Sequence, residues 1–155
     1  MGCTTRIGLS LGAAAGLALF VSAGPAPQLA AKRFINLDDL PKPNGYTHVV
    51  TSPPGRMIFI SGQGGRGSDG RMPTDFSAQA DNTFKNLGRC LEKAGARFGD
   101  VVKINYFVAD LGNTEELRRV RARYLNMAAP PAATLVQAGL APGLLLEVEA
   151  VAVVP

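Results

Sequence analysis

The carboxyl-terminal segment 144–154, with the sequence LLLEVEAVAVV, restricts the fold more than any other part of the chain. Side chains alternate across a β-strand, so Glu147 and Glu149 share one face with two valines, while the other face is wholly apolar. Neither face is the polar surface expected of a strand that borders solvent. The segment therefore predicts a strand covered on both faces, with carboxylates at the rim of a buried region.

The length and composition of the chain indicate one domain with one sizeable hydrophobic core. Of its 155 residues, 46% are hydrophobic and 18% are charged, which is typical of globular and not of disordered proteins. The formal net charge of +4 is mild, whereas nucleic-acid binders usually carry a concentrated basic face. The overall charge therefore favours no particular partner.

Residues 1–23 have the layout of a secretory signal peptide. Arg6 precedes the uncharged run 7–21, and Val21-Ser22-Ala23 supplies small residues for cleavage. The alternative is an uncleaved membrane anchor, but the run is short against the roughly 20 residues that a bilayer span needs. We expect export to the periplasm or secretion, without stable membrane association once the signal is cleaved.

The rest of the chain divides into a linker, 24–40, and a single folded domain, 41–155. Cleavage of the signal would leave Cys90 as the only cysteine, so no internal disulfide is expected. His48 is the only histidine. Because a structural zinc site needs about four Cys or His ligands and a catalytic one about three, neither is expected.

The pattern of the folded part predicts the element order ββ-α-β-α-ββ. Two β-rich runs around a proline-rich turn predict a hairpin, and apolar residues spaced three and four apart predict helices. The expected elements are strands 48–51 and 57–61, a helix 74–94 capped by Thr74 or Asp75, a strand 101–108, a helix 114–126, and strands 134–138 and 144–154.

Two helices can cover one face of the resulting sheet but not both, so the expected fold class is α+β. The other face carries Glu147, Glu149, Val151 and Val153. Because the valines require burial, we expect a homo-oligomer in which another subunit covers this face.

Two further patterns favour simple explanations. Residues 62–67 match G-x-G-x-x-G, but dinucleotide binding requires a helix that opens on the glycines, and residues 68–73 intervene. The second helix is rich in arginine, but nearby glutamates favour a solvated face with ion pairs over a nucleic-acid surface. Its arginines are Arg118, Arg119, Arg121 and Arg123.

On the residues alone, Glu147 has two explanations. A carboxylate beside the end of an apolar strand suits general acid–base chemistry, and the same position suits an exposed carboxylate at a sheet edge. His48 has no serine–acid partnership, and Cys90 has no neighbours that would form a thiolate.

Several segments, in a fixed order, carry a resemblance to a known family. The segments are Tyr46, Ile60-Ser61-Gly62-Gln63, Ala78-Gln79 through Asn86-Leu87, Asp100-Val101-Val102-Lys103, Tyr106 through Leu111, Pro130-Pro131-Ala132-Ala133-Thr134 and Glu147 through Val153. In these segments the chain resembles the Rid family, also called YjgF/UK114 or L-PSP, over about residues 46–154.

The resemblance implies a single-domain, chorismate-mutase-like α+β fold. It also implies a homotrimer whose sheets line a central barrel, with ligand clefts between subunits. Well-known members are 2-iminoacid deaminases, which hydrolyse enamine or imine intermediates to 2-ketoacids and ammonia without a cofactor. We therefore expect self-association, a small-molecule ligand, no cofactor and no nucleic-acid partner.

The resemblance also implies site residues. Glu147 matches the cleft glutamate that positions or activates water, and Tyr46 matches the family's tyrosine, so both are candidate catalytic residues. Ser61, Gly62 and Thr134 match substrate-binding positions that line the cleft.

Ala133 matches a further substrate-binding position and is the main departure from the family pattern. In the deaminases an arginine stands there and grips the substrate carboxylate through its fork. Loss of such a contact typically costs about 2–5 kcal/mol, or roughly 30- to 3,000-fold in binding or rate. Arg66, in the glycine-rich loop 62–72, is a candidate substitute.

Three functions follow from these residues. The first is a Rid-like hydrolase of C=N or related substrates that works without the usual arginine. The second is a non-catalytic small-molecule-binding trimer of the same fold. The third is a ribonuclease, as the L-PSP name suggests, and it ranks last because the chain has no paired histidines and no metal-ligand set.

Overall fold

The computed structural model describes residues 1–2 and 31–155. The predicted cleavage point and nearly all of the predicted signal peptide lie outside the described residues, as does the first part of the predicted linker. Within the described part of the chain, no helix has the length and apolar character needed to cross a membrane.

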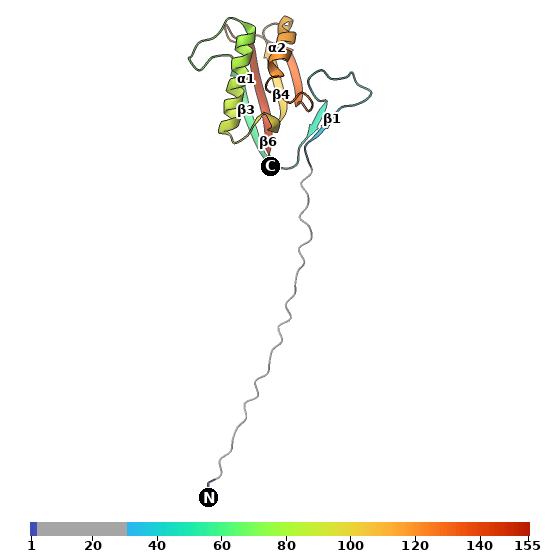
Figure 1. The fold of residues 1–155 in the computed structure, drawn as a ribbon, viewed down its shortest axis with the longest axis vertical. Coiled ribbons are helices and arrows are strands. Elements are labelled where there is room, and N and C mark those ends of the chain that lie inside the picture. Colours follow the sequence, from blue (N-terminus) through green and yellow to red (C-terminus); the bar gives the residue numbers. More distant parts are fainter. Residues whose placement is uncertain (3–30) are drawn as a thin grey trace.

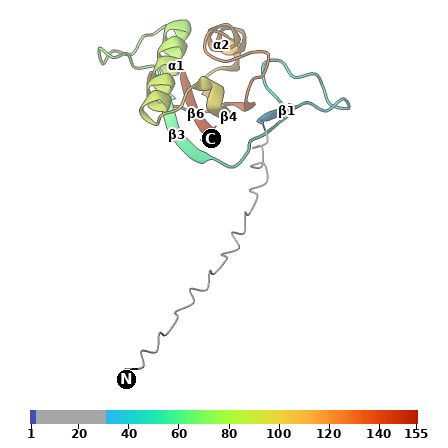
Figure 2. The ribbon, with the colours of Figure 1, turned by 60° about the horizontal axis from the view of Figure 1, so that its bottom comes forward.

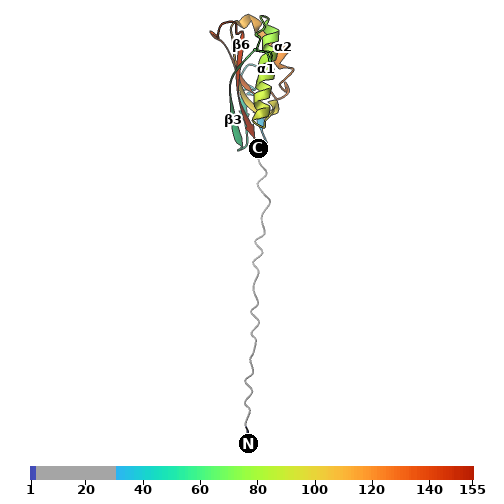
Figure 3. The ribbon, with the colours of Figure 1, turned by 90° about the vertical axis from the view of Figure 1, so that its left-hand side faces the viewer.

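A four-stranded sheet with two helices on one face forms the body of the domain. Its elements, with two short 3₁₀ turns omitted, are β1 (Arg33–Ile35), β2 (Val49–Thr51), β3 (Arg56–Gly64), α1 (Phe76–Lys93), β4 (Val101–Val108), α2 (Thr114–Arg121), β5 (Ala132–Gln137) and β6 (Leu146–Val154). The strand order is β3-β6-β4-β5, with β6 antiparallel to β3 and β4, and β5 parallel to β4. Figure 3 shows α1 and α2 on the same side of the sheet.

The short β1–β2 ribbon lies at the β5 side of the body, away from β3 and α1 (Figure 1 and Figure 2). A bridge between Thr47 and Ala132 joins the chain just before β2 to the start of β5. Part of the predicted linker thus forms strand β1, which the local sequence pattern did not indicate.

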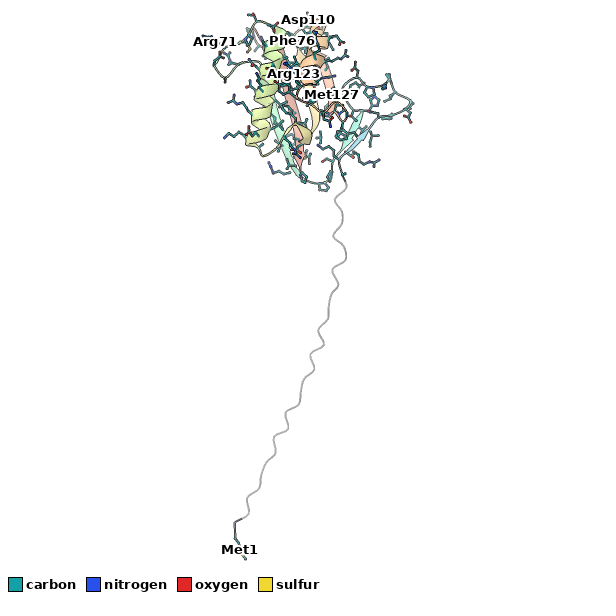
Figure 4. All side chains as sticks on the ribbon, viewed as in Figure 1. Met1, Arg71, Phe76, Asp110, Arg123 and Met127 are labelled. Carbon is teal, nitrogen blue, oxygen red and sulfur yellow. The ribbon has the colours of Figure 1, made fainter. Side chains whose placement is uncertain are left out.

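Helix α1 begins and ends as its sequence predicts. The Asp75 side chain accepts a hydrogen bond from the backbone N–H of Ala78 at 2.8 Å, a cap typically worth about 1 kcal/mol. Phe76, labelled in Figure 4, starts the apolar face that packs on the sheet. Gly95, at φ +69°, follows the helix and ends it in the left-handed conformation that glycine adopts freely.

The core fills the space between the helices and the inner face of the sheet. Alternate residues of β4 and β6 meet the apolar stripes of both helices there. The most deeply buried of these side chains are Phe84, Leu87, Leu91, Ile104, Tyr106, Val108, Leu117, Val120, Leu146 and Val148.

The predicted hairpin between 48–51 and 57–61 is wrong. β2 pairs with β1, and β3 pairs with β6. The turn signal was local, whereas β6 runs beside nearly all of β3 and holds Ile58 and Ile60 against the core. A three-residue strand cannot offer β3 an equivalent partner.

Helix α2 ends at Arg121 rather than near residue 126. Beyond it, the N–H groups of Arg123 and Tyr124 bond to carbonyls three residues back, a tighter pattern than the α-helix. This turn accompanies the stacking of Tyr124 on Phe84, with ring centroids 5.1 Å apart.

Candidate functional site

The first group of predicted site residues lies where β3 meets β6. The register shifts between Ile60 and Gln63, so Ser61 and Gly62 occupy an irregularity in the ladder. A Cβ placed on Gly62 would overlap Oε1 of Glu147 and come within 2.7 Å of its Cδ. Gly62 therefore allows the Glu147 carboxylate to lie directly against the β3 backbone.

Glu147 and Glu149 share the outer face of β6 but differ in their partners. Glu149 accepts a hydrogen bond from Nδ2 of Asn105 at 2.8 Å, and with Ser61 and Lys103 it lines a cavity of about 280 Å³. Glu147 is half-buried, and within the described residues its carboxylate has no hydrogen bond or ion pair. Of the two carboxylates, Glu147 is thus the one free to contact water or a ligand.

The second group of predicted site residues lies at β5. The Thr47 N–H donates to the Pro131 carbonyl at 3.2 Å, and the Thr47 hydroxyl donates to the Pro130 carbonyl at 2.6 Å. These bonds hold the chain before β2 along the start of β5. Tyr46 and Ala133 consequently line one cavity of about 340 Å³, together with Asn44, Tyr106, Thr114, Leu117, Arg118, Arg121 and Leu135.

Arg121 contradicts the prediction that the arginines of α2 form a solvated face. Arg118 and Arg119 do pair with Glu115 and Glu116, as that prediction requires. The Arg121 side chain instead points into the protein, and the residue is only 6% exposed. The spacing of charges agrees with this difference, because Arg118 and Arg119 each follow a glutamate by three positions, whereas Arg121 follows Glu116 by five.

The Arg121 guanidinium has few partners. Its Nη2 donates to the Asn44 carbonyl at 2.9 Å, while Nε is buried without a partner among the described residues. Its Cζ lies 5.7 Å from the centroid of the Tyr106 ring. A Cβ on Gly45, at φ +77°, would overlap Nη2 and lie 2.9 Å from Cζ, so Gly45 makes room for the guanidinium.

Tyr106 brings a second unpaired donor to the same cavity. Its hydroxyl is buried and has no hydrogen-bond partner among the described residues. Burial raises the pKa of Tyr106 to about 12, although the nearby charge of Arg121 opposes the rise. The phenol is therefore neutral and able to donate at physiological pH.

Within one chain the two groups are not brought together. Phe107 of β4 faces Glu147 on one side and Val136 on the other, and Ala133 lies three residues before Val136. Two strand spacings and three residue steps separate the Glu147 and Ala133 backbones by about 14 Å. The two side chains also lie on opposite faces of the sheet, because Ala133 is paired with the buried Ile104.

Thr134 and Arg66 lie away from the Ala133 cavity. The Thr134 hydroxyl accepts a hydrogen bond from Nζ of Lys103 at 2.6 Å. Nη1 of Arg66 donates to the Gly70 carbonyl at 2.6 Å, within its own exposed loop. Arg71 marks the same loop in Figure 4, where it projects beyond the start of α1. The cavity beside Ala133 is lined by arginines of α2 and not by Arg66.

A further cavity, of about 460 Å³, contains none of the predicted site residues. It lies between the β1 region and the body, where Phe34, Phe98 and Leu125 line it. Lys32 also lines it, and burial lowers the pKa of this lysine. The lining offers no unpaired buried polar atom comparable with those of the Arg121 cavity.

The described residues hold no group of three or more His, Cys, Asp and Glu side chains placed to bind a metal ion. Nδ1 of His48 accepts a hydrogen bond from the Leu37 N–H at 3.1 Å. Its ring also meets the Tyr46 ring edge-on, with centroids 5.7 Å apart. His48 thus helps to position Tyr46.

Known proteins of the same architecture are similar to this chain in both sequence and structure. The family model described as endoribonuclease L-PSP matches residues 38–154. Protein DfrA of Myxococcus xanthus is 33% identical over 126 residues, which cover 79% of this chain and 96% of that protein. The 2-iminobutanoate/2-iminopropanoate deaminase of Mus musculus is 35% identical over 100 residues, covering 63% of this chain and 74% of the enzyme.

Among solved structures, the Rid family protein YyfB from Yersinia pestis superposes with a TM-score of 0.68 at 30% identity, covering 81% of this chain and 100% of that one. RidA from an Antarctic Psychrobacter species gives a TM-score of 0.61 at 30% identity, covering 79% and 99%. These likenesses confirm the predicted chorismate-mutase-like α+β fold. The chain belongs to the Rid family, whose family model bears the endoribonuclease L-PSP description.

Proposed function

We propose that this protein hydrolyses the C=N bond of small imines or enamines. The observation that supports this best is the Glu147 carboxylate, which lies against the Gly62 backbone without a partner among the described residues. The mouse relative named 2-iminobutanoate/2-iminopropanoate deaminase supports the reaction class. A carboxylate positioned beside a water molecule can act as the general base for this reaction.

In the proposed reaction, Glu147 accepts a proton from water as the water oxygen attacks the imine carbon. The imine nitrogen takes a proton from solvent, so that a tetrahedral carbinolamine forms. The carbinolamine hydroxyl then returns a proton to solvent as the C=O bond forms and the C–N bond breaks, and the nitrogen leaves as ammonia with the proton held by Glu147. One imine and one water thus give one carbonyl compound and one ammonia.

The proposed site lies between subunits of a homotrimer. Glu147 lies near the β3 edge of the sheet and the Ala133 cavity at the β5 edge, so a head-to-tail ring places one beside the other. The outer face of β3 also exposes Met57 and Phe59, at 57% and 73%. Apolar side chains this exposed, opposite Val151 and Val153 in register, support burial against another subunit.

The test is ammonia release from freshly generated imines, charged and uncharged, by the full-length chain and by Glu147→Gln. We expect release faster than in buffer for the wild type and close to the buffer rate for the variant. Equal rates for wild type and buffer across the panel would disprove the hydrolase proposal.

A second candidate is a ligand-binding trimer without catalytic activity. The observation that favours it is Ala133, which stands where the deaminases carry the carboxylate-binding arginine. This function predicts thermal stabilisation by a small ligand that is equal in the wild type and in Glu147→Gln, with no ammonia release from either.

A further inference from the structure

We infer that Arg121 binds the carboxylate of the substrate, in place of the arginine that is missing at position 133. The substrates would then be 2-iminoacids and the products 2-ketoacids. This assignment of substrate class rests on the proposed function. The binding site itself rests on the structure of the cavity beside Ala133.

The first argument is the state of the guanidinium. An arginine side chain has five N–H donors, and Arg121 makes one hydrogen bond within the described residues. Only 6% of the residue is exposed, and no carboxylate of the described residues forms an ion pair with it. A buried charge without a counter-ion is unfavourable, so an anionic ligand would supply the charge that the described residues do not offer to Arg121.

The second argument is the shape of the surroundings. Ala133 has only a methyl group, so the start of β5 leaves space that a longer side chain would fill. The Arg121 guanidinium reaches the same cavity from α2. It fits there because Gly45 has no side chain, and a Cβ at this position would overlap the guanidinium. The charge that the family places on the strand is thereby supplied from the neighbouring helix.

The third argument is that the cavity offers further donors of the right kind. The unpaired Tyr106 hydroxyl lines it together with Arg121. Arg118 also lines the cavity and forms an ion pair with Glu115. A volume of about 340 Å³ suits a small 2-ketoacid, and all charged side chains of the lining are positive.

A structural role for Arg121 is the competing explanation. Its contact with the Tyr106 ring and its bond to Asn44 stabilise the protein whether or not a ligand binds. These two contacts leave Nε unsatisfied, and they do not require a cavity beside it. The structural explanation therefore accounts for the position of the guanidinium but not for its unused donors.

The test compares 2-oxobutanoate with butanone, its match without the carboxylate, by titration calorimetry. We expect the wild type to bind only 2-oxobutanoate, and Arg121→Gln to bind it at least about 30-fold more weakly, the lower end for a lost charge-assisted contact. Arg119→Gln is the matched control, because it removes the same charge from an exposed position of α2. Equal affinity of Arg121→Gln and wild type, or no binding by the wild type, would overturn the inference.

A measurement on the wild type keeps the test valid if Arg121→Gln fails to fold. In protein labelled with ¹⁵N-arginine, the Nε–H signal of Arg121 is expected to shift with 2-oxobutanoate and not with butanone. An unshifted signal refutes the carboxylate site. If the signal shifts but no imine releases ammonia, the hydrolase proposal is wrong and the carboxylate site is confirmed. If ammonia is released but the signal does not shift, the hydrolase proposal is supported and the carboxylate site is wrong.

Discussion

The β3–β6 edge and the β5–α2 edge of the domain each bring a charged side chain close to a glycine, but the two charges are in different states. At the first edge, Glu147 lies against Gly62 and is half-exposed. At the second, Arg121 lies against Gly45 and is buried with one hydrogen bond. The acid is placed for reaction with water, whereas the arginine is placed to hold an anion.

The two edges also differ in what completes them. The Arg121 cavity is formed by one chain, from β5, α2 and the segment before β2. Glu147 faces away from it, and its backbone lies about 14 Å from that of Ala133 by strand geometry. Binding is therefore expected of a single subunit, while chemistry is expected to need a neighbour.

The largest effect is expected from Glu147→Gln, which keeps the shape of the side chain and removes the base. The rate of ammonia release should fall by about 10²- to 10⁴-fold, the usual contribution of a positioned general base. The affinity for 2-oxobutanoate should stay within about twofold, because Arg121 is unchanged. Steady-state kinetics and calorimetry on the same preparation check both statements, and unchanged rates would remove Glu147 from the mechanism.

The next effect tests whether the acid needs a neighbouring subunit. Phe59→Asp places a charge on the exposed outer face of β3, where burial of the phenylalanine is worth about 1.5–3 kcal/mol per interface, or roughly 10- to 150-fold. We expect dissociation in sedimentation velocity, with loss of ammonia release but continued binding of 2-oxobutanoate. Leu40→Asp is the control, since Leu40 is exposed but lies outside the sheet. A stable, active assembly of Phe59→Asp would contradict the proposed interface.

Much of the fold follows from local patterns in the sequence. The apolar stripe and the Asp75 cap predicted α1 to within a residue or two, and alternation predicted β4 and β6. The pairing of β2 was mispredicted because its partner β1 is a three-residue strand without a recognisable pattern. Pairing between distant segments depends on which surfaces they bury, and turn residues do not report that.

The candidate site likewise includes residues that the sequence predicted and one that it did not. Gly62 and Glu147 were predicted from the family pattern, and the structure brings their atoms into contact distance. Arg121 was missed because the prediction grouped the arginines of α2 together, although Arg121 follows Glu116 by five positions and so cannot form the i,i+3 pair that Arg118 and Arg119 form. Two further signals could have identified it: the absence of an arginine at position 133, and a glycine immediately before Tyr46.

The third prediction moves the guanidinium between the two positions that can hold it. In Arg121→Ala the affinity for 2-oxobutanoate should fall by at least about 30-fold. Adding Ala133→Arg to that variant should recover about tenfold, because a guanidinium again reaches the cavity, now from β5. Calorimetry on the single and double variants checks this. No recovery in a folded double variant would show that the cavity needs the orientation given by α2.

The smallest effect is expected at Tyr106, the neutral donor beside Arg121. Tyr106→Phe should weaken 2-oxobutanoate binding by about 2- to 10-fold, the worth of one ordinary hydrogen bond. At neutral pH the free energy of unfolding should change by less than about 1 kcal/mol, since the lost hydroxyl has no partner among the described residues.

The same hydroxyl gives the stability a distinct pH dependence. Burial raises the pKa of Tyr106 from 10.0 to about 12, so between these values the folded chain keeps a proton that the unfolded chain has lost. The free energy of unfolding must then fall as the pH rises above 10, by up to about 1.4 kcal/mol per unit, while the contribution below pH 10 is constant. Urea denaturation of wild type and Tyr106→Phe from pH 8 to 11 should show curves that run parallel up to about pH 10, above which the wild-type free energy of unfolding falls more steeply than that of the variant. Curves that stay parallel throughout would mean that the phenol reaches solvent, and the cavity beside Arg121 would then be too wet to hold a carboxylate tightly.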